Sequence, residues 1–572
     1  MKRCFLTLAL FLSAIFTNAQ IIDNQLLEEM NRRSEEEQIE VIAVMKARYD
    51  RDVLNRKANA FATRAERRDF VVKELKSFAE ASQKDLIEYI NSSKDMRFGT
   101  SLWMSNSIAF SATKDAILMI SGRDDIKIMG LDKKQHLVPE VISSGEAMNH
   151  VQTREITPNI TQVNVDRVWE LGYTGTGVVV AVVDSGVNYE HADLADHLWD
   201  GGEEFPHHGY DIVNGDDDPM DDKGHGTHVA GIVCGDGTSG TQTGAAPDAT
   251  LMCVKSTAVD GFGGSVNIAG GMEWAVEHGC DMISMSLGMA GAADTDKIVL
   301  RRTCVAVNDA GIVAAVCAGN EGNSFLQMAY PIPNNVRVPA SCPPPYLDPD
   351  QLANPGELSC VVAVGAVNGN DEAASFTSQG PVTWQDINEF GDYAYEPGIG
   401  LIRPDVCAPG VAIKSLDYEN INGYTNMDGT SQATPLVGGI IALMLQKNPN
   451  LMPADICRIL EETSVKLTPN KSNITGVGRV DALAAVNAVE PYDAIVENEN
   501  VTFSIYPNPA KDFITICGDG QRPSMEISLF SIYGKLMDIH VLNNNQIDIS
   551  DLRPGIYLLK VQDKFLKLVV ER

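Results

Sequence analysis

The chain has 572 residues, of which 44% are hydrophobic and 21% are charged, and this is the composition of a large globular protein of several domains. Its formal net charge is −32 at pH 7, which would repel phosphates and argues against a nucleic-acid partner. No stretch beyond the first twenty residues reaches about 18 uninterrupted apolar residues, which argues against a membrane-spanning helix.

Residues 1–19 have the features of a secretory signal peptide. Lys2 and Arg3 provide a basic start, residues 4–16 are mostly apolar, and residues 17–19 offer a small-residue cleavage site. The apolar stretch is too short to span a bilayer. We therefore expect an exported protein that is either secreted or attached to the cell surface.

Most of the 11 cysteines lie inside apolar segments, where cysteine acts as a small buried hydrophobic residue. Cys342 and Cys360 differ, because they bracket a proline-rich insertion. In an exported chain this pair is the best candidate for a disulfide, and two separate thiols are the alternative.

Residues 20–150 predict a small α+β domain. Residues 68–90 carry apolar side chains near helical spacing, and residues 113–121 predict a short helix that begins at a threonine and ends before a glycine. Residues 101–112 and 126–131 predict strands.

Residues 151–490 have a different pattern, in which continuous apolar runs alternate with helical segments. The runs are residues 178–184, 250–256, 281–288, 311–320 and 360–367. Such runs predict a doubly wound, mostly parallel α/β sheet that is covered by helices on both faces. Functional sites in these sheets form at the carboxyl ends of the strands.

Residues 491–572 contain seven short apolar runs separated by turn signals, without a helical segment. This pattern predicts a small Ig-like β-sandwich as a third domain.

Four polar residues of the central domain lie at the ends of predicted elements. Asp184 and Asn320 end strands, and His225 and Ser431 begin helices. Each residue alone could equally be a helix cap or a turn residue. His228, which follows His225 by one turn, is interpreted as a packed core histidine.

Taken together, these four residues match one kind of chemistry. A serine is a weak nucleophile until a base removes its proton, and a histidine base needs a carboxylate to orient it and to stabilise its charge. The oxyanion that forms on the substrate needs hydrogen-bond donors, such as an asparagine amide. The set therefore predicts hydrolysis through a serine nucleophile.

Five motifs resemble the signature blocks of the subtilisin-like serine proteases, in that family's chain order. They are VAVVDSGV (180–187), HGTHVAG (225–231), SMSLG (284–288), CAGNEG (317–322) and GTSQATP (429–435). The resemblance covers most of the central domain, and it implies protein or peptide substrates and a chemistry that requires no cofactor.

The resemblance also implies roles for individual residues. Asp184, His225 and Ser431 would form the catalytic triad, and Asn320 would form the oxyanion hole with the Ser431 backbone N–H. The residues implied to bind substrate are Gly263, Gly264, Ser286, Leu287 and Gly288, which would pair with the substrate main chain, and Glu321, which would lie beside the pocket for the residue ahead of the cut bond.

The two flanking domains resemble known domains as well. Residues 101–132 are similar to subtilisin-family prodomains, which implies a domain that assists folding and inhibits the enzyme until it is removed. YPNPAKD (506–512) and LRPGIYLLKV (552–561) resemble the C-terminal sorting domain of the type IX secretion system of Bacteroidetes. The alternative for residues 20–150 is an unrelated accessory domain. The alternative for residues 491–572 is an adhesive sandwich.

Acidic residues gather in residues 214–226, but their spacing is not that of an EF-hand. Turn carboxylates facing water are the favoured interpretation. Asp193 aligns with a calcium ligand of some relatives, so the sequence leaves a structural calcium site open.

The expected protein is thus a secreted serine endopeptidase made as a latent precursor. Two alternatives stay open, a processing protease with a narrow target and a catalytically inactive surface adhesin or scaffold on a protease fold.

Overall fold

The structure is a computed structural model, and by its internal contacts the chain divides into two compact units, Met1–Tyr492 and Asp493–Arg572. The expected signal peptide and Cys360, one partner of the expected disulfide, lie outside the described residues. The structure describes residues 21–138, 155–322, 324–344, 351, 361–384, 387, 400–492, 503–518, 527–531, 535–537, 539–543, 546–561 and 564–571.

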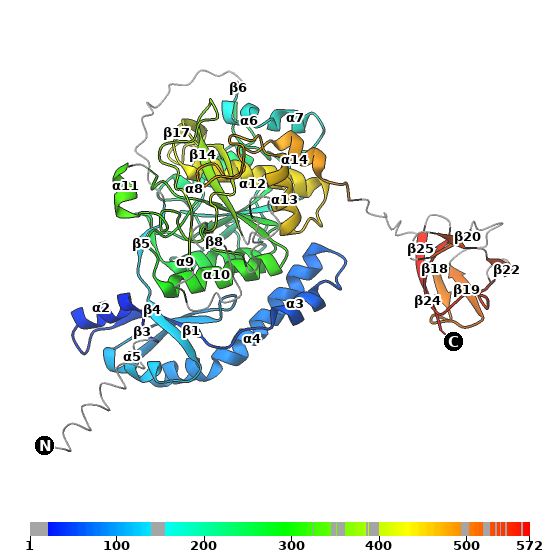
Figure 1. Ribbon diagram of the computed structural model, residues 1–572, viewed down its shortest axis with the longest axis horizontal. Coiled ribbons are helices and arrows are strands. Elements are labelled where there is room, and N and C mark those ends of the chain that lie inside the picture. The colour runs from blue at the N-terminus through cyan, green and yellow to red at the C-terminus, as the bar shows by residue number, and fades with distance from the viewer. Residues whose placement is uncertain are drawn as a thin grey trace, which may run out of the picture. The chain divides into compact units, whose positions relative to one another are not determined.

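The N-terminal part, residues 21–138, contains a four-stranded antiparallel sheet with the order β2-β3-β1-β4 (Figure 1). The expected strand over residues 101–112 is wrong, because residues 103–106 turn the chain and Asn106 adopts a left-handed φ of 52°. The strands are β1 (Ile39–Met45), β2 (Met96–Leu102), β3 (Ser107–Ala112) and β4 (Ile126–Leu131).

Helices cover this sheet, and two of them were expected. Helix α4 (Arg64–Ser92) begins with a capping box in which Thr63 and Glu66 bond to each other's backbone N–H groups. The other helices are α2 (Asn24–Arg32), α3 (Arg51–Ala58) and α5 (Lys114–Ser121).

The central part, residues 155–492, is built on a seven-stranded parallel sheet with the order β15-β14-β13-β12-β7-β10-β8. This confirms the expected doubly wound α/β sheet, and the apolar runs predicted five of its strands. The strands are β7 (Val179–Asp184), β8 (Gly209–Asp211), β10 (Thr250–Lys255), β12 (Met282–Met285), β13 (Val313–Cys317), β14 (Val362–Val367) and β15 (Val406–Pro409).

Successive residues of each strand contribute to opposite cores, which is why the strand sequences are apolar throughout. In β7, Ala181 and Val183 join one hydrophobic cluster with helices α9 (Ser265–Glu277) and α10 (Asp294–Asp309). Val180 and Val182 join the other cluster, on the opposite face. The helices of that face are α8 (His225–Cys234), α12 (Thr430–Lys447), α13 (Pro453–Thr463) and α14 (Ala482–Ala488).

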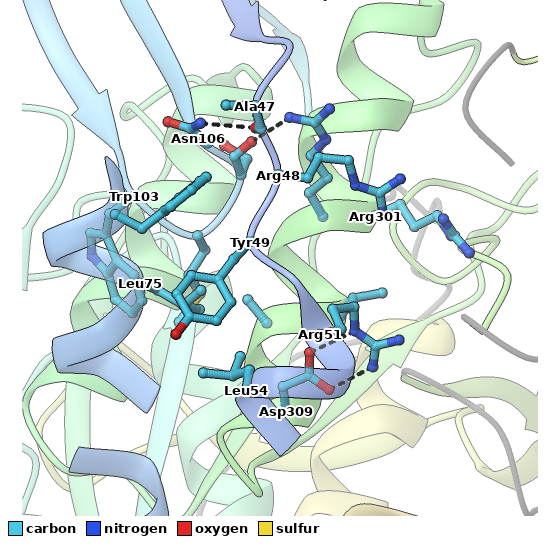
Figure 2. A pocket seen from close by; sticks show the side chains of 16 residues that line it. Ala47, Arg48, Tyr49, Arg51, Leu54, Leu75, Trp103, Asn106, Arg301 and Asp309 are labelled. Atoms are coloured by element: carbon cyan, nitrogen blue, oxygen red, sulfur yellow. Dashed lines mark hydrogen bonds and ion pairs between the residues drawn. The ribbon is translucent and has the colours of Figure 1, made fainter. Parts of the chain in front are cut away.

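The N-terminal part packs on α9 and α10 through apolar contacts and buried ion pairs. Arg64 lies 2.7 Å from the Asp281 carboxylate, and Arg51 donates from Nε and Nη2 to both oxygens of Asp309. A pocket at this interface is lined from both sides, with Trp103 and Asp309 among its residues (Figure 2).

The C-terminal unit consists of two four-stranded sheets, with the orders β18-β19-β23-β22 and β21-β20-β24-β25, and both contribute to one hydrophobic core. Its strands are β18 (Phe503–Tyr506), β19 (Phe513–Gly518), β20 (Ile527–Ser531), β21 (Leu536–Met537), β22 (His540–Asn543), β23 (Gln546–Asp548), β24 (Gly555–Val561) and β25 (Lys564–Val570). One expected run, residues 536–542, divides between β21 and β22, which lie in different sheets. Within the described residues, no helix has the length and apolar character that a bilayer crossing requires.

Candidate active site

Asp184 and His225 meet at the carboxyl end of the central sheet. Asp184 is the last residue of β7, His225 is the first of α8, and Nδ1 of His225 lies 2.6 Å from Oδ1 of Asp184. The close approach requires a glycine after the histidine, because a Cβ at Gly226 would collide with the carbonyl oxygen of Gly186. A carboxylate at Nδ1 leaves Nε2 as the basic nitrogen of a neutral imidazole.

Nε2 of His225 is buried and has no hydrogen-bond partner among the described residues. Ser431 lies in the first turn of α12, and its hydroxyl donates to the Ser286 carbonyl oxygen at 3.4 Å. The hydrogen bond expected from Ser431 to His225 is therefore not formed in this structure. Catalytic hydrogen bonds are often long before substrate binds and shorten in the complex.

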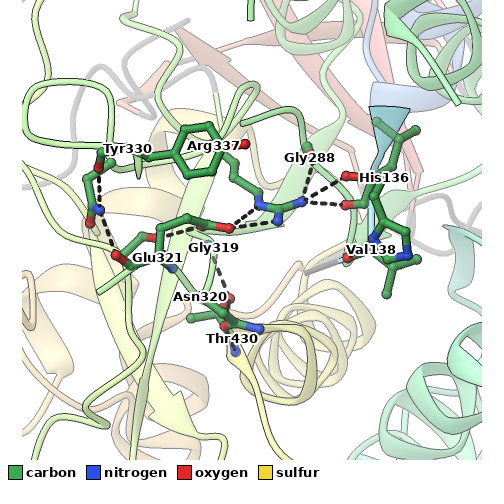
Figure 3. Close-up of polar contacts among 12 residues, drawn as sticks. His136, Val138, Gly288, Gly319, Asn320, Glu321, Tyr330, Arg337 and Thr430 are labelled. Carbon is green, nitrogen blue, oxygen red and sulfur yellow. Dashed lines mark hydrogen bonds and ion pairs between the residues drawn. The ribbon is translucent and has the colours of Figure 1, made fainter. Parts of the chain in front are cut away.

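Asn320 lies at the carboxyl side of β13, and its orientation is set by one neighbour. Its Oδ1 accepts hydrogen bonds from the backbone N–H of Thr430 at 2.9 Å and from the Thr430 hydroxyl at 3.0 Å (Figure 3). These two donors assign the oxygen of the amide and turn Nδ2 to the other side. Asn320 and the start of α12 are thereby held next to each other.

His228 lies in α8, the helix that begins at His225, and it is fully buried, as its interpretation as a core histidine requires. Its Nε2 lies 3.1 Å from the Ile413 carbonyl oxygen and 3.3 Å from that of Thr425, so this nitrogen carries the proton. Burial lowers the pKa of His228 to about 3. His228 therefore stays neutral and serves packing, which distinguishes it from His225.

The acidic segment 214–226 contains one buried residue whose role differs from the expected one. Asp221 is 6% exposed and accepts hydrogen bonds from the Ser185 and Thr227 hydroxyls and from the backbone N–H groups of Lys223, Gly224 and Thr227. The interpretation of this residue as a turn carboxylate in water is wrong. It joins the loop after Asp184 to the start of α8.

Asp193, the residue considered for calcium, has both carboxylate oxygens occupied by donors. Oδ1 accepts the Ser239 backbone N–H at 2.6 Å, and Oδ2 accepts the Tyr424 hydroxyl at 2.8 Å. Within the part of the chain that is described, no group of three or more His, Cys, Asp or Glu side chains is arranged to hold a metal ion. The donor set at Asp193 does not fit a cation.

Residues 135–137 lie between residues 261–263 and Gly288, and these two segments form the edges of a groove. Strand β5 (Gln135–His136) pairs antiparallel with β11 (Phe262–Gly263), and Leu137 donates its N–H to the Gly261 carbonyl oxygen. On the other side, the Gly288 N–H donates to the Leu137 carbonyl oxygen at 3.0 Å. The groove therefore already holds a peptide between its two edges.

The residues expected to bind substrate divide into three groups. The first group, Gly263 and Gly288, contacts this strand. The second group is used inside the domain, and in it Gly264 is the N-cap of α9 and donates its N–H to Asn267. Ser286 donates its hydroxyl to the Ser431 carbonyl oxygen at 2.8 Å, and Leu287 is fully buried.

Glu321 alone makes up the third group, and 2% of its surface is exposed. Its Oε1 lies 2.7 Å from Nη2 of Arg337 in a buried ion pair (Figure 3). The sequence reasoning missed both Arg337 and Asp221. Each is a charged residue of a type that is mostly exposed, and only the partners that folding supplies identify it as buried.

Comparisons with known proteins agree with the fold. Residues 175–478, more than half of the chain, match the model of the subtilase family. Residues 504–571 match the model of the secretion system C-terminal sorting domain.

Individual relatives agree as well. Bacillopeptidase F of Bacillus subtilis is 30% identical over 469 residues, which are 76% of this chain and 30% of that protein. Serine protease AprX of the same species is 34% identical over 342 residues, 54% of this chain and 66% of AprX. The chain thus spans less than two thirds of either relative. Subtilisin DY of Bacillus licheniformis is 32% identical over 326 residues, which are 57% of this chain and 97% of subtilisin DY.

The parallel sheet, the Asp–His pair at its carboxyl end and these matches lead to one assignment. The chain belongs to the subtilase family and carries a secretion system C-terminal sorting domain.

Proposed function

We propose that this chain is a secreted serine endopeptidase, in which Ser431 is the nucleophile, His225 the general base and Asp184 the carboxylate that orients it. The observation that supports this most is the 2.6 Å contact between Asp184 and Nδ1 of His225, together with a buried Nε2 that has no partner among the described residues. A basic nitrogen without a partner in the protein can accept the proton of a hydroxyl group that approaches it.

In the proposed reaction, the Ser431 oxygen attacks the peptide carbonyl carbon while Nε2 of His225 takes the hydroxyl proton. Asp184 stabilises the resulting imidazolium. Nδ2 of Asn320 and the N–H of Ser431, at the start of α12, donate to the oxyanion. His225 then protonates the leaving amine, and water repeats the sequence on the acyl-enzyme.

We further propose that residues 20–150 are a prodomain, the remainder up to residue 490 the catalytic domain, and residues 491–572 the sorting domain. The main-chain pairing of residues 135–137 with residues 261–263 and Gly288 supports inhibition, because we propose that substrate binds between the same two segments. Export would use the signal peptide to reach the periplasm and the type IX secretion machinery to cross the outer membrane.

The test uses the full chain expressed with its own signals. A fluorophosphonate probe should label Ser431, and the recovered protein should hydrolyse casein and lose its N-terminal part. The variant Ser431→Ala should remain full-length, unlabelled and inactive. If purified Ser431→Ala still hydrolyses casein, the proposed nucleophile is wrong. If the unmodified protein neither reacts nor hydrolyses, the inactive adhesin or scaffold is the better reading.

A further inference from the structure

The space between the segments 286–289 and 318–321 is closed by a third segment of the chain. The backbone N–H of Arg337 donates to the Ala318 carbonyl oxygen at 2.9 Å, and Val338 exchanges two hydrogen bonds with Met289. Arg337 therefore lies at the bottom of this space, which we call its floor. The segments 286–289 and 318–321 form the two walls.

The aliphatic part of Arg337 fills the floor. A Cβ added to Gly288 would lie 2.9 Å from Cβ of Arg337, and one added to Gly319 would lie 2.9 Å from its Cγ. Real side chains do not approach this closely, so the arginine contacts both walls at van der Waals distance. No room for a long side chain remains between them at this depth.

The charged end of Arg337 is held in one orientation by Glu321. Nε and Nη2 donate to Oε1 of Glu321 at 2.9 and 2.7 Å, and the Ser378 hydroxyl occupies Oε2 at 2.9 Å. Arg337 is 8% exposed and Glu321 is 2% exposed. Both oxygens of Glu321 are thus already engaged, and its charge is matched by that of the arginine.

The remaining nitrogen of Arg337 contacts the peptide in the groove. Nη1 donates to the Gly288 carbonyl oxygen at 2.9 Å and to the carbonyl oxygens of Leu137 and His136 at 3.0 and 3.3 Å (Figure 3). His136 belongs to β5, which pairs with β11, and Leu137 follows it, so Arg337 binds the main chain of the segment that lies where the proposed function places the substrate.

We propose that Arg337, held by Glu321, is a specificity-determining residue that makes the chain select substrates with a small uncharged side chain, such as glycine, alanine or serine, immediately ahead of the cut bond. This inference rests on the proposed endopeptidase function. Aromatic and long aliphatic side chains are excluded by the filled floor. Lysine and arginine are disfavoured because the carboxylate that would attract them is already paired.

The test compares four peptides that differ only in the residue ahead of the cut bond, which is alanine, phenylalanine, lysine or aspartate. The matured protein should cleave the alanine peptide at least tenfold more efficiently, in kcat/KM, than each of the others. The double variant Arg337→Ala/Glu321→Ala removes both charges together and opens the floor. Its phenylalanine-to-alanine ratio of kcat/KM should rise at least tenfold.

A second double variant, Arg337→Met/Glu321→Gln, keeps the volume and removes the charges. It should keep the preference for alanine within threefold, while KM rises severalfold for every peptide because the Nη1 contact is lost. Arg479→Ala serves as a matched control, since Arg479 is also buried and paired with one carboxylate, that of Asp371, at 2.7 Å. It should leave the ratios unchanged.

Casein hydrolysis by each variant separates the two proposals. If casein is cleaved but the unmodified protein cuts after phenylalanine, lysine or aspartate as efficiently as after alanine, or the opened variant keeps its ratio, the size limit is refuted and the endopeptidase proposal stands. If the unmodified protein neither reacts with the fluorophosphonate probe nor cleaves casein or any of the four peptides, the endopeptidase proposal fails and the size limit fails with it.

Discussion

Glu273 of helix α9 accepts a hydrogen bond from the backbone N–H of Met104, in the turn between β2 and β3, at 2.7 Å. The backbone N–H groups of Trp103 and Ser105 face the same carboxyl group. This single side chain therefore links the central part of the chain to the N-terminal part, and it is buried by that contact.

The contact should depend on pH. Burial raises the pKa of Glu273 to about 8, from 4.5 for the same group in water. Between pH 4.5 and 8, Glu273 is protonated while the N-terminal part is packed on the central part, and it is ionised when the two parts have separated. The association is therefore strongest below about pH 4.5 and weakens, by up to about tenfold per pH unit, as the pH rises towards 8.

Amide hydrogen exchange in residues 103–106 of the full-length Ser431→Ala chain measures this opening between pH 5.5 and 8, after correction for intrinsic exchange. Glu273→Gln should reduce the slope without abolishing it, because burial also raises the pKa of Asp296 to about 7. Glu277→Gln, on the same helix but in a partly exposed pair with Lys76, should change the slope less than Glu273→Gln, because the Glu277 charge raises the pKa of Glu273 less than burial does. A pH-independent opening in the parent chain would contradict the prediction.

Replacement of the proposed nucleophile and base should show that they act as one unit. Ser431→Ala should lower kcat/KM for peptides by about 10⁴ to 10⁶, and His225→Ala by a similar factor. The double variant should be no slower than either single variant, because the remaining residue has no partner. Steady-state kinetics on purified proteins give the three factors, and additive losses would argue against a shared proton transfer.

The amide of Asn320 should act mainly on the transition state. Asn320→Ala should lower kcat by about 10²- to 10³-fold and change KM by less than threefold, because we propose that its donor faces the oxyanion rather than the bound peptide. Thr430→Val removes only one of the two donors that orient the amide, so its loss of kcat should stay below about tenfold. A change confined to KM would place Asn320 in substrate binding instead.

Asp221 should matter for stability and for geometry. Asp221→Ala would leave five donors without an acceptor, and we expect it to destabilise the chain by about 3 kcal/mol or more. Asp216→Ala, an exposed residue of the same acidic segment, should cost no more than about 0.5 kcal/mol. Urea unfolding in the Ser431→Ala background avoids self-digestion, and equal effects of the two substitutions would contradict the assigned role of Asp221.

The sequence alone was enough to identify the parallel sheet and to propose Asp184 and His225 as partners. Buried strands of such sheets are apolar throughout, and their carboxyl ends meet at one edge, so local patterns carry this information. The helix that begins at His225 was likewise readable, because Gly235 ends it.

Only the tertiary structure decided how the charged residues Arg337, Asp221 and Glu273 are used. Some of their partners are close in the chain and others are far away, and a charge becomes buried only when folding places those partners around it. The same holds for the turn at residues 103–106, because the antiparallel pairing of β2 with β3 shows where the chain reverses. Propensity and periodicity are properties of neighbours in sequence, whereas pairing and burial are properties of neighbours in space.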